Sequence, residues 1–184
     1  MEHLGPRDRV SATHPELVWL RKAIVERALT RGDYLLSGGV RSDYYIDKFS
    51  LFSEPHVLRR IARLFTPIIA EINPDMIGGT ELGGVVIATA VSSLSNIPMI
   101  AVRKQPKRYG AFADEYVEGP YTRGQHVLLL EDVVTNGGEV LAAARRLEEL
   151  GLRVTPYAVI SRGLAPINAL IAFSLPSSDA KTEN

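Results

Sequence analysis

Residues 127–139 carry the sequence VLLLEDVVTNGGE, in which an apolar run leads through two acids into a turn with a hydroxyl group and two glycines. The run 127–130 is typical of a buried strand of a parallel sheet, and the segment 139–150 has the pattern of a helix. The turn therefore lies between the carboxyl end of a strand and the amino end of a helix. Free backbone N–H groups and the positive end of the helix dipole make such a turn an anion site. Gly137 and Gly138 let the backbone approach a phosphate closely.

The two acids need a different partner, because carboxylates repel a phosphate. Ribose hydroxyls or a magnesium ion would serve Glu131 and Asp132, and Thr135 can donate a hydroxyl to the phosphate. No lysine follows the glycines and no G-x-x-x-x-G-K motif precedes them, which argues against a nucleotide P-loop. The two acids alone would also fit the strand end of an unrelated α/β domain, so the rest of the chain has to separate these interpretations.

Composition excludes several classes of function. The chain has 184 residues, 46% of them apolar, which suits a single α/β domain. Its 21 acids and 21 bases give a net charge of zero, so no overall charge favours nucleic acid or an anionic membrane. Without cysteine the chain has no disulfide, no thiol catalysis and no thiolate metal site. No stretch of about 18 apolar residues occurs and the first residues are polar, so we expect a cytoplasmic protein without a membrane span.

Helical and extended patterns alternate along the chain. A helical stripe covers 15–31 and ends at Gly32, and 33–47 reads as two extended segments joined by a turn at Gly38 and Gly39, which together suggest a small N-terminal hood. Further helices are expected from the Ser53-Glu54-Pro55 start to the Asn73-Pro74 stop and at 85–95, and further strands at 76–77, 98–102 and 154–160. This alternation predicts a mostly parallel sheet flanked by helices, with ligands at the carboxyl ends of the strands.

The expected organisation is one domain between two flexible tails. The tails are 1–14 and 176–184, and the domain covers 15–175, with the hood at about 15–50 and the core at about 51–165. Within the core, the span 104–125 shows little periodicity, which is typical of a lid or a binding loop.

Four cations stand at the start of this span, namely Arg103, Lys104, Lys107 and Arg108. By themselves they would fit a solvated charged loop. Beside a sugar-phosphate turn, however, such cations would stabilise the negative charge of a departing diphosphate, and a closing loop would keep water from a reactive ribosyl cation.

The stretch 127–139 resembles the phosphoribosyl-diphosphate (PRPP) motif of type I phosphoribosyltransferases. Four further motifs occur in the order that the orotate phosphoribosyltransferases have, and the resemblance covers about residues 15–165. They are SDYYID at 42–47, GTELGG at 79–84, RKQPKRYG at 103–110 and VEG at 117–119.

The resemblance implies a type I phosphoribosyltransferase-like parallel sheet with a hood. It also implies the transfer of ribose 5-phosphate from PRPP to orotate, which gives orotidine 5′-monophosphate and diphosphate in pyrimidine (UMP) biosynthesis. The cofactor would be Mg²⁺, carried by PRPP without direct protein ligands. The family further suggests a homodimer in which the loop 104–125 reaches the neighbouring site, with small molecules and not nucleic acid as partners.

The resemblance also assigns roles to single residues. Lys104, Lys107 and Asp132 would be catalytic, and Arg162 would bind the orotate carboxylate, unless it forms an ordinary surface ion pair. Tyr44 and Tyr45 match the aromatic pair beside the base, although either would also fit a cross-strand core pair. The remaining substrate-binding residues would be Arg103 and Arg108 for diphosphate, Glu131 and Asp132 for ribose, and Thr135, Asn136, Gly137, Gly138 and Glu139 for the 5′-phosphate.

Four positions depart from the pattern of the family. Ser37 replaces a lysine, Leu82-Gly83-Gly84 replaces Tyr-Lys-Gly, Tyr109 replaces a histidine and Asn136 replaces a threonine. Backbone amides at Gly83 and Gly84 could serve the diphosphate in place of the lost lysine, and Tyr109 is assigned no catalytic proton. Asn136 tolerates left-handed geometry, so phosphate binding should survive.

Two alternatives stay open. The chain could transfer ribose 5-phosphate to a purine or another base, or it could be a regulator that senses PRPP or a nucleotide without turnover. Arg162 and the hood segment 37–45 favour orotate over a purine, because a purine has no carboxylate for a cation to bind.

Overall fold

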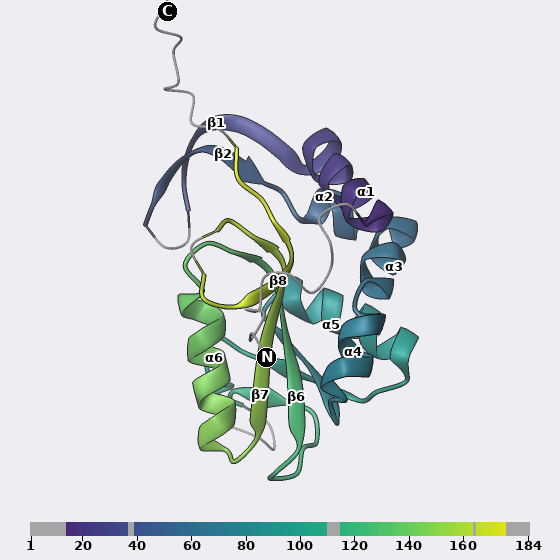
Figure 1. Cartoon of the computed structure of the whole chain (residues 1–184). Coiled ribbons are helices and arrows are strands. Elements are labelled where there is room, and N and C mark those ends of the chain that lie inside the picture. The colour runs from purple at the N-terminus through teal and green to yellow at the C-terminus, as the bar shows by residue number, and fades with distance from the viewer. Residues whose placement is uncertain (1–13, 37–38, 110–114, 164, 176–184) are drawn as a thin grey trace, which may run out of the picture.

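The computed structural model describes residues 14–36, 39–109, 115–163 and 165–175. Its centre is a six-stranded sheet (Figure 1), which confirms the predicted α/β fold with a mostly parallel sheet. Four neighbouring pairs of strands are parallel, and only β5 runs antiparallel to its neighbour β4. The order across the sheet is β5 (Val117–Glu118), β4 (Met99–Val102), β3 (Met76–Thr80), β6 (His126–Val134), β7 (Arg153–Ser161) and β8 (Asn168–Ala172).

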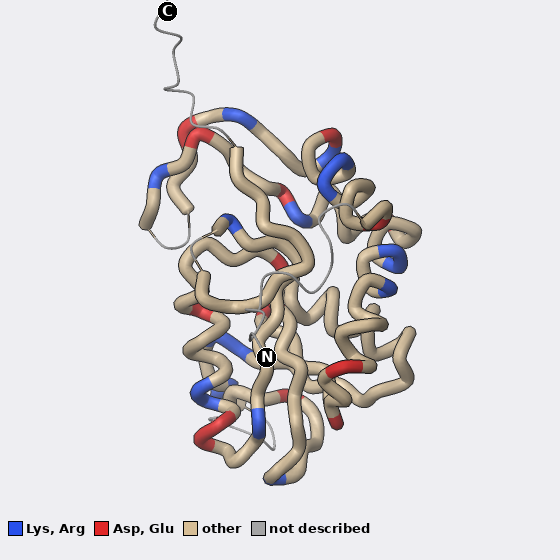
Figure 2. Tube along the Cα trace, in the orientation of Figure 1, with Lys and Arg blue, Asp and Glu red and all other residues tan. Residues whose placement is uncertain are grey.

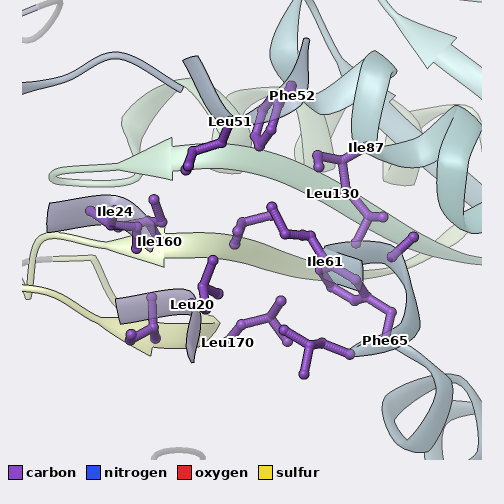
Figure 3. Packing of buried hydrophobic residues seen from close by; sticks show 14 of the residues in the cluster. Leu20, Ile24, Leu51, Phe52, Ile61, Phe65, Ile87, Leu130, Ile160 and Leu170 are labelled. Atoms are coloured by element: carbon purple, nitrogen blue, oxygen red, sulfur yellow. The ribbon is translucent and has the colours of Figure 1, made fainter. Parts of the chain in front are cut away.

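Strand β6 is buried on both faces, which explains why its sequence is apolar without alternation. Leu128 and Leu130 belong to the core on one face of the sheet, whereas Val127 and Leu129 belong to the core on the other. Figure 3 shows Leu130 and Ile160 of the sheet among buried side chains from the helices of the first face.

Helices cover both faces of this sheet. Figure 1 places α6 (Gly138–Glu149) on one side and α3 (Pro55–Arg63), α4 (Thr66–Ile72) and α5 (Gly83–Ser95) on the other. Among these residues and the rest of the described chain, no helix combines the length and the apolar character needed to cross a membrane. Lysines, arginines and acids are interspersed over the helices and the strand ends (Figure 2), in keeping with the neutral overall charge.

The order of the strands places a crevice between β3 and β6. From β3 the chain passes through α5 to β4 on one side, and from β6 it passes through α6 to β7 on the other side. Because the two connections diverge, the carboxyl ends of β3 and β6 are left open between them, which is the usual ligand position in such a sheet. Thr80 ends β3, and Glu131 and Asp132 lie near the end of β6.

The predicted hairpin of the hood is present as β1 (Leu29–Leu35) and β2 (Arg41–Ile46), which pair antiparallel. The helix predicted for 15–31 is too long. It consists of α1 (Pro15–Ala23) and a π-helical turn η1 (Ile24–Ala28), after which residues 29–31 pair with Ile46, Tyr45 and Tyr44. Gly32 therefore lies inside β1 and does not end a helix, because pairing with β2 outweighs the helical pattern.

The single helix predicted up to Asn73 is divided into α3 and α4. Pro67 lies in the first turn of α4 and has no N–H to continue the bonding of α3, so the chain breaks at Leu64 and Phe65. The stop at Asn73 is confirmed, since Asn73 adopts a left-handed conformation with φ of 48°.

Strand β8 was not predicted. It adds a parallel strand beside β7 and contacts α1, where the Arg21 guanidinium donates to the carbonyl of Ala172 at 2.8 Å. The predicted tails apart from His14, the hood residues Ser37 and Gly38, and residues 110–114 of the loop lie outside the described residues.

Candidate functional site

A pocket opens at the carboxyl ends of β3 and β6, where the order of the strands leaves a crevice. It contains both predicted acids, the whole predicted phosphate turn and Lys104. Its lining residues are Lys48, Glu81, Lys104, Glu131, Asp132, Val133, Val134, Thr135, Asn136, Gly137, Gly138, Glu139 and Val140.

Glu131 is 7% exposed and is held by two donors. The Thr80 hydroxyl donates to Oε2 at 2.6 Å, and the backbone N–H of Asp132 donates to Oε1 at 3.1 Å. Burial, with repulsion from the Asp132 carboxylate, raises the pKa of Glu131 to about 7. The Thr80 bond also joins β3 to β6 across the crevice.

Asp132 is 3% exposed, and its two oxygens have different partners. Oδ1 accepts the backbone N–H of Val133, and Oδ2 lies 3.0 Å from the ammonium of Lys48. Burial alone would lower the pKa of Lys48, but attraction and hydrogen bonding to Asp132 outweigh it, so the pKa is raised and the ammonium stays charged. Sequence reasoning missed Lys48, which follows the motif 42–47 directly but carries no local sign of a role.

The turn after β6 is open toward the pocket. Gly137 has a φ of 79° and precedes α6, and the amide oxygen of Asn136 accepts the N–H of Gly138 at 3.1 Å. A methyl group on Gly138 would meet only that amide oxygen, at 3.5 Å. The amino end of α6 therefore presents its backbone to the pocket without a bulky side chain in front of it, as an anion site requires.

The turn after β3 is closed by packing, although it is also rich in glycine. A Cβ at Gly79 would lie 2.5 Å from the carbonyl oxygen of Gly84, and one at Gly84 would lie 2.4 Å from the carbonyl oxygen of Leu130. At Gly83 it would lie 1.7 Å from Oδ2 of Asp132. The departure from lysine at position 83 therefore has a steric basis, because Asp132 fills the space where a side chain would start. The peptide between Glu81 and Leu82 is cis.

The predicted loop cations are paired with acids of the same chain. Arg103 lies 3.7 Å from Glu81 and 3.4 Å from Glu118, and Lys107 lies 3.4 Å from Glu118. The ammonium of Lys104 lies 2.6 Å from the Glu139 carboxylate at the rim of the pocket. The structure thus brings Lys104 to the phosphate turn and holds Arg103 and Lys107 at the root of the loop.

Two further residues of this loop point outward. Arg108 is exposed, and Tyr109 is 69% exposed. The Lys107 ammonium lies 5.3 Å from the centre of the Tyr109 ring.

Arg162 follows β7 and lies beside the end of β6, because its backbone N–H donates to Val134 at 2.8 Å. Its side chain reaches β2 and donates to the Ser42 hydroxyl at 2.7 Å and to the Tyr44 hydroxyl at 3.2 Å. Its guanidinium also stands 3.9 Å from the centre of the Tyr44 ring. Among the described residues no acid forms an ion pair with Arg162, so its charge is available to an anionic ligand.

The two predicted tyrosines point to opposite faces of β2. Tyr44 is buried against Arg162 and Phe173, whereas Tyr45 is exposed and its ring centre lies 5.6 Å from that of Tyr34. Adjacent residues of a strand alternate in direction, so the pair cannot flank one ligand from the same side.

A resident metal ion is not favoured by the donor set. In the parts of the chain that the structure describes, no group of three or more His, Cys, Asp or Glu could hold one. Glu131 and Asp132 already accept from Thr80, Lys48 and backbone N–H groups, which suits further hydroxyl donors.

Comparison with known proteins agrees with this geometry. The family described as "Phosphoribosyl transferase domain" matches residues 50–167. Orotate phosphoribosyltransferase of Thermococcus gammatolerans is 40% identical over 141 residues, which are 76% of this chain and 74% of that protein. Orotate phosphoribosyltransferase from Aeropyrum pernix has a similar structure, with a TM-score of 0.69 and 26% identity, over 82% of this chain and 90% of that one. UMP synthase of Leishmania donovani gives a TM-score of 0.71 and 27% identity over 83% of this chain, which spans 35% of that longer protein.

Proposed function

The chain belongs to the orotate phosphoribosyltransferases, and from this membership we propose that it transfers ribose 5-phosphate from PRPP to N1 of orotate. The products are orotidine 5′-monophosphate and diphosphate, so the reaction is a step of pyrimidine synthesis.

The observation that carries this proposal is the position of the two buried carboxylates beside the open amino end of α6. The ribose 2′ and 3′ hydroxyls of PRPP donate to Glu131 and Asp132, and its 5′-phosphate accepts backbone N–H groups of residues 135–139. The acids and the phosphate turn are separated by only two residues, Val133 and Val134, so one ribose 5-phosphate can span both.

Breaking the bond between C1′ and the diphosphate places positive charge on the ribose and negative charge on the leaving group. The carboxylates of Glu131 and Asp132 favour the ribosyl cation electrostatically. Magnesium, when bound with PRPP, neutralises part of the diphosphate charge. Arg103, Lys104 and Lys107 stabilise the rest, and for this Lys104 exchanges the Glu139 carboxylate for the substrate. Orotate N1 then forms the new bond to C1′.

Arg162 supplies the preference for orotate. Its guanidinium is fixed by Ser42 and Tyr44 and still has donors left for a carboxylate. Orotate presents such a carboxylate and a purine does not. A transferase for purines would gain nothing from this cation, which argues against the first alternative.

A substrate panel tests the proposal. The protein is incubated with PRPP and Mg²⁺, and consumption of orotate is followed by its absorbance in parallel with uracil, adenine and hypoxanthine. We expect orotate alone to be consumed and Asp132→Asn to abolish most of the turnover without unfolding the domain. Turnover of adenine or hypoxanthine would assign the chain to another base, and binding of PRPP without any turnover would favour a regulator.

We also propose a homodimer in which Lys107 acts on the site of the partner, as the resemblance suggests. Lys107→Ala and Asp132→Asn should each be inactive, whereas mixing them restores one hybrid site per mixed dimer, or about a quarter of the wild-type activity after random exchange. Confirmed subunit exchange without recovery would contradict a shared site. Cytoplasmic location stays a prediction from the sequence.

A further inference from the structure

Lys48 is the one cation in direct contact with the proposed ribose-binding acids among the described residues, and it lies outside all the roles assigned above. Its ammonium stands 3.0 Å from Oδ2 of Asp132, the Lys48 side chain is 29% exposed, and Lys48 lines the pocket. A lysine that served only the core would have no reason to line the pocket.

The backbone around Lys48 is firmly placed. Asp47 donates its N–H to the carbonyl of Ala28 at 2.8 Å, which ties it to the end of η1. The Asp47 carboxylate accepts the N–H of Phe49 at 3.1 Å and the hydroxyl of Ser50 at 2.7 Å, and so starts the short helix α2 (Phe49–Phe52). Leu51 and Phe52 of α2 are buried in the core. Lys48 is therefore a fixed arm that extends from the end of the hood to β6.

The two acids need such an arm because they are adjacent, buried and alike in charge. Burial and repulsion from Asp132 already raise the pKa of Glu131 to about 7, and loss of the cation that balances Asp132 would raise it further. A protonated Glu131 could not accept hydroxyls with all its oxygens. The turn after β3 cannot supply the cation, since Oδ2 of Asp132 occupies the place of a side chain at Gly83. The same oxygen is the one that Lys48 contacts.

We propose that Lys48 is a positioning residue of the ribose site, which balances the charge of the Asp132 carboxylate and holds this side chain directed into the pocket. This inference rests on the proposed binding of ribose by Glu131 and Asp132. The charged and titratable groups around the pair are Glu131 on β6, Tyr45 on β2, Glu81 after β3, and Lys104 and Glu139 at the rim. Among the cations that the structure describes, only Lys48 forms an ion pair with Asp132, whereas Lys104 is paired with Glu139.

The direct test is the binding of ribose 5-phosphate between about pH 6.5 and pH 9, measured by titration calorimetry. This probe has the ribose and the 5′-phosphate but no diphosphate, so it does not report contacts to the leaving group. Lys48→Met removes the charge and keeps the length, and Lys48→Arg keeps the charge. Lys22→Met is the matched control, because Lys22 is an exposed lysine on α1 paired only with Glu26.

We expect Lys48→Met to weaken binding about tenfold or more at pH 6.5 and to approach the wild-type affinity near pH 9, because alkali ionises Glu131 even without the neighbouring cation. Lys48→Arg and Lys22→Met should follow the wild type at every pH. A loss of equal size at all pH values, or no loss, would overturn the proposal, since a purely structural lysine would not shift the pH profile.

A chemical rescue covers the case in which Lys48→Met does not fold. The chain has no cysteine, so Lys48→Cys carries the only thiol, and aminoethylation of that thiol rebuilds a lysine-like ammonium. Recovery of the affinity at pH 6.5 after aminoethylation would support the inference, and unchanged weak binding would contradict it. Failure of the proposed function can be distinguished from failure of this inference. A wild-type protein that binds ribose 5-phosphate but leaves orotate unchanged would refute the proposed activity, and the role of Lys48 in binding could still be tested.

Discussion

The turns after β3 and β6 are both rich in glycine and both lead from a parallel strand into a helix, yet they use glycine for opposite purposes. In the turn after β6, Gly137 and Gly138 leave space, so that a ligand can approach the backbone. In the turn after β3, the missing side chains of Gly79, Gly83 and Gly84 allow close packing with α5 and β6, and no space is left for a ligand. A glycine-rich turn is therefore evidence for a ligand only when the volume in front of it is empty.

The largest effect is expected from Gly84→Ala. A methyl group there would lie 2.4 Å from the carbonyl oxygen of Leu130 and 2.7 Å from the Thr80 hydroxyl, and backbone atoms of β6 cannot move aside. Alanine normally stabilises a helix by up to about 1 kcal/mol, but we expect overpacking to reverse the sign and destabilise the protein by about 3 kcal/mol. The melting temperature should fall by roughly 6 to 12 °C. An unchanged melting temperature would show that α5 does not pack on β6 in this way.

Gly83→Ala separates packing from chemistry within the same turn. Its methyl group would collide with the Asp132 carboxylate, which is a side chain and can be displaced away from Lys48. We expect kcat/KM for PRPP to fall about 100-fold, or about 2.7 kcal/mol, with a smaller loss of thermal stability than in Gly84→Ala. In combination with Asp132→Asn the effect should largely vanish, because the displaced group is already impaired. Full additivity of the two losses would mean that Gly83 acts independently of Asp132.

Glu131→Gln changes the residue that joins the ends of β3 and β6 through the Thr80 hydroxyl. The folded protein raises the pKa of Glu131 from an ordinary 4.5 to about 7, so the folded state holds this proton more tightly than the unfolded chain does. Stability is therefore lost as the pH rises from 4.5 to about 7, and the full penalty persists above pH 7. Glutamine keeps the shape without the charge, so it should match the wild type near pH 4.5 and exceed its stability at pH 8 by on the order of 1 to 3 kcal/mol, while activity falls. Thermal melts at both pH values measure this difference in stability. If the variant and the wild type differed equally at the two pH values, burial of the Glu131 charge would not be the cause.

The alternation of strands and helices was predictable, because a strand buried on both faces must be apolar throughout, as 127–130 is. The acids and the phosphate turn were predictable as one site, because they are contiguous in the sequence. The predicted elements were wrong where pairing between segments distant in the sequence determines the structure. Residues 29–31 have a helical pattern but pair with β2, and β8 is a short strand of modest hydrophobicity that depends on β7 and α1.

The division into α3 and α4 could not be predicted from the sequence for a different reason. Apolar residues continue at helical spacing through the break, and only the missing N–H of Pro67 interrupts the bonding. Lys48 was also beyond sequence reasoning, since its partner Asp132 is distant along the chain and a lysine after a strand is ordinary. Its role depends on where the hood meets the sheet, which no local pattern encodes.

The smallest effect on stability is expected from Gly138→Ala in the open turn, and this variant should be stabilised where Gly84→Ala is destabilised. The new methyl group would meet only the Asn136 amide oxygen at 3.5 Å, which is an ordinary contact, and Gly138 does not have a positive φ. Alanine should therefore stabilise α6 by less than about 1 kcal/mol, yet weaken ribose 5-phosphate binding severalfold, because the methyl group stands where the phosphate approaches. Gly137→Ala is the contrasting variant, since its φ of 79° strains any side chain and stability should fall. If Gly138→Ala binds ribose 5-phosphate as tightly as the wild type, the space in front of this turn is not where the phosphate lies, and the difference between the two turns loses its functional meaning.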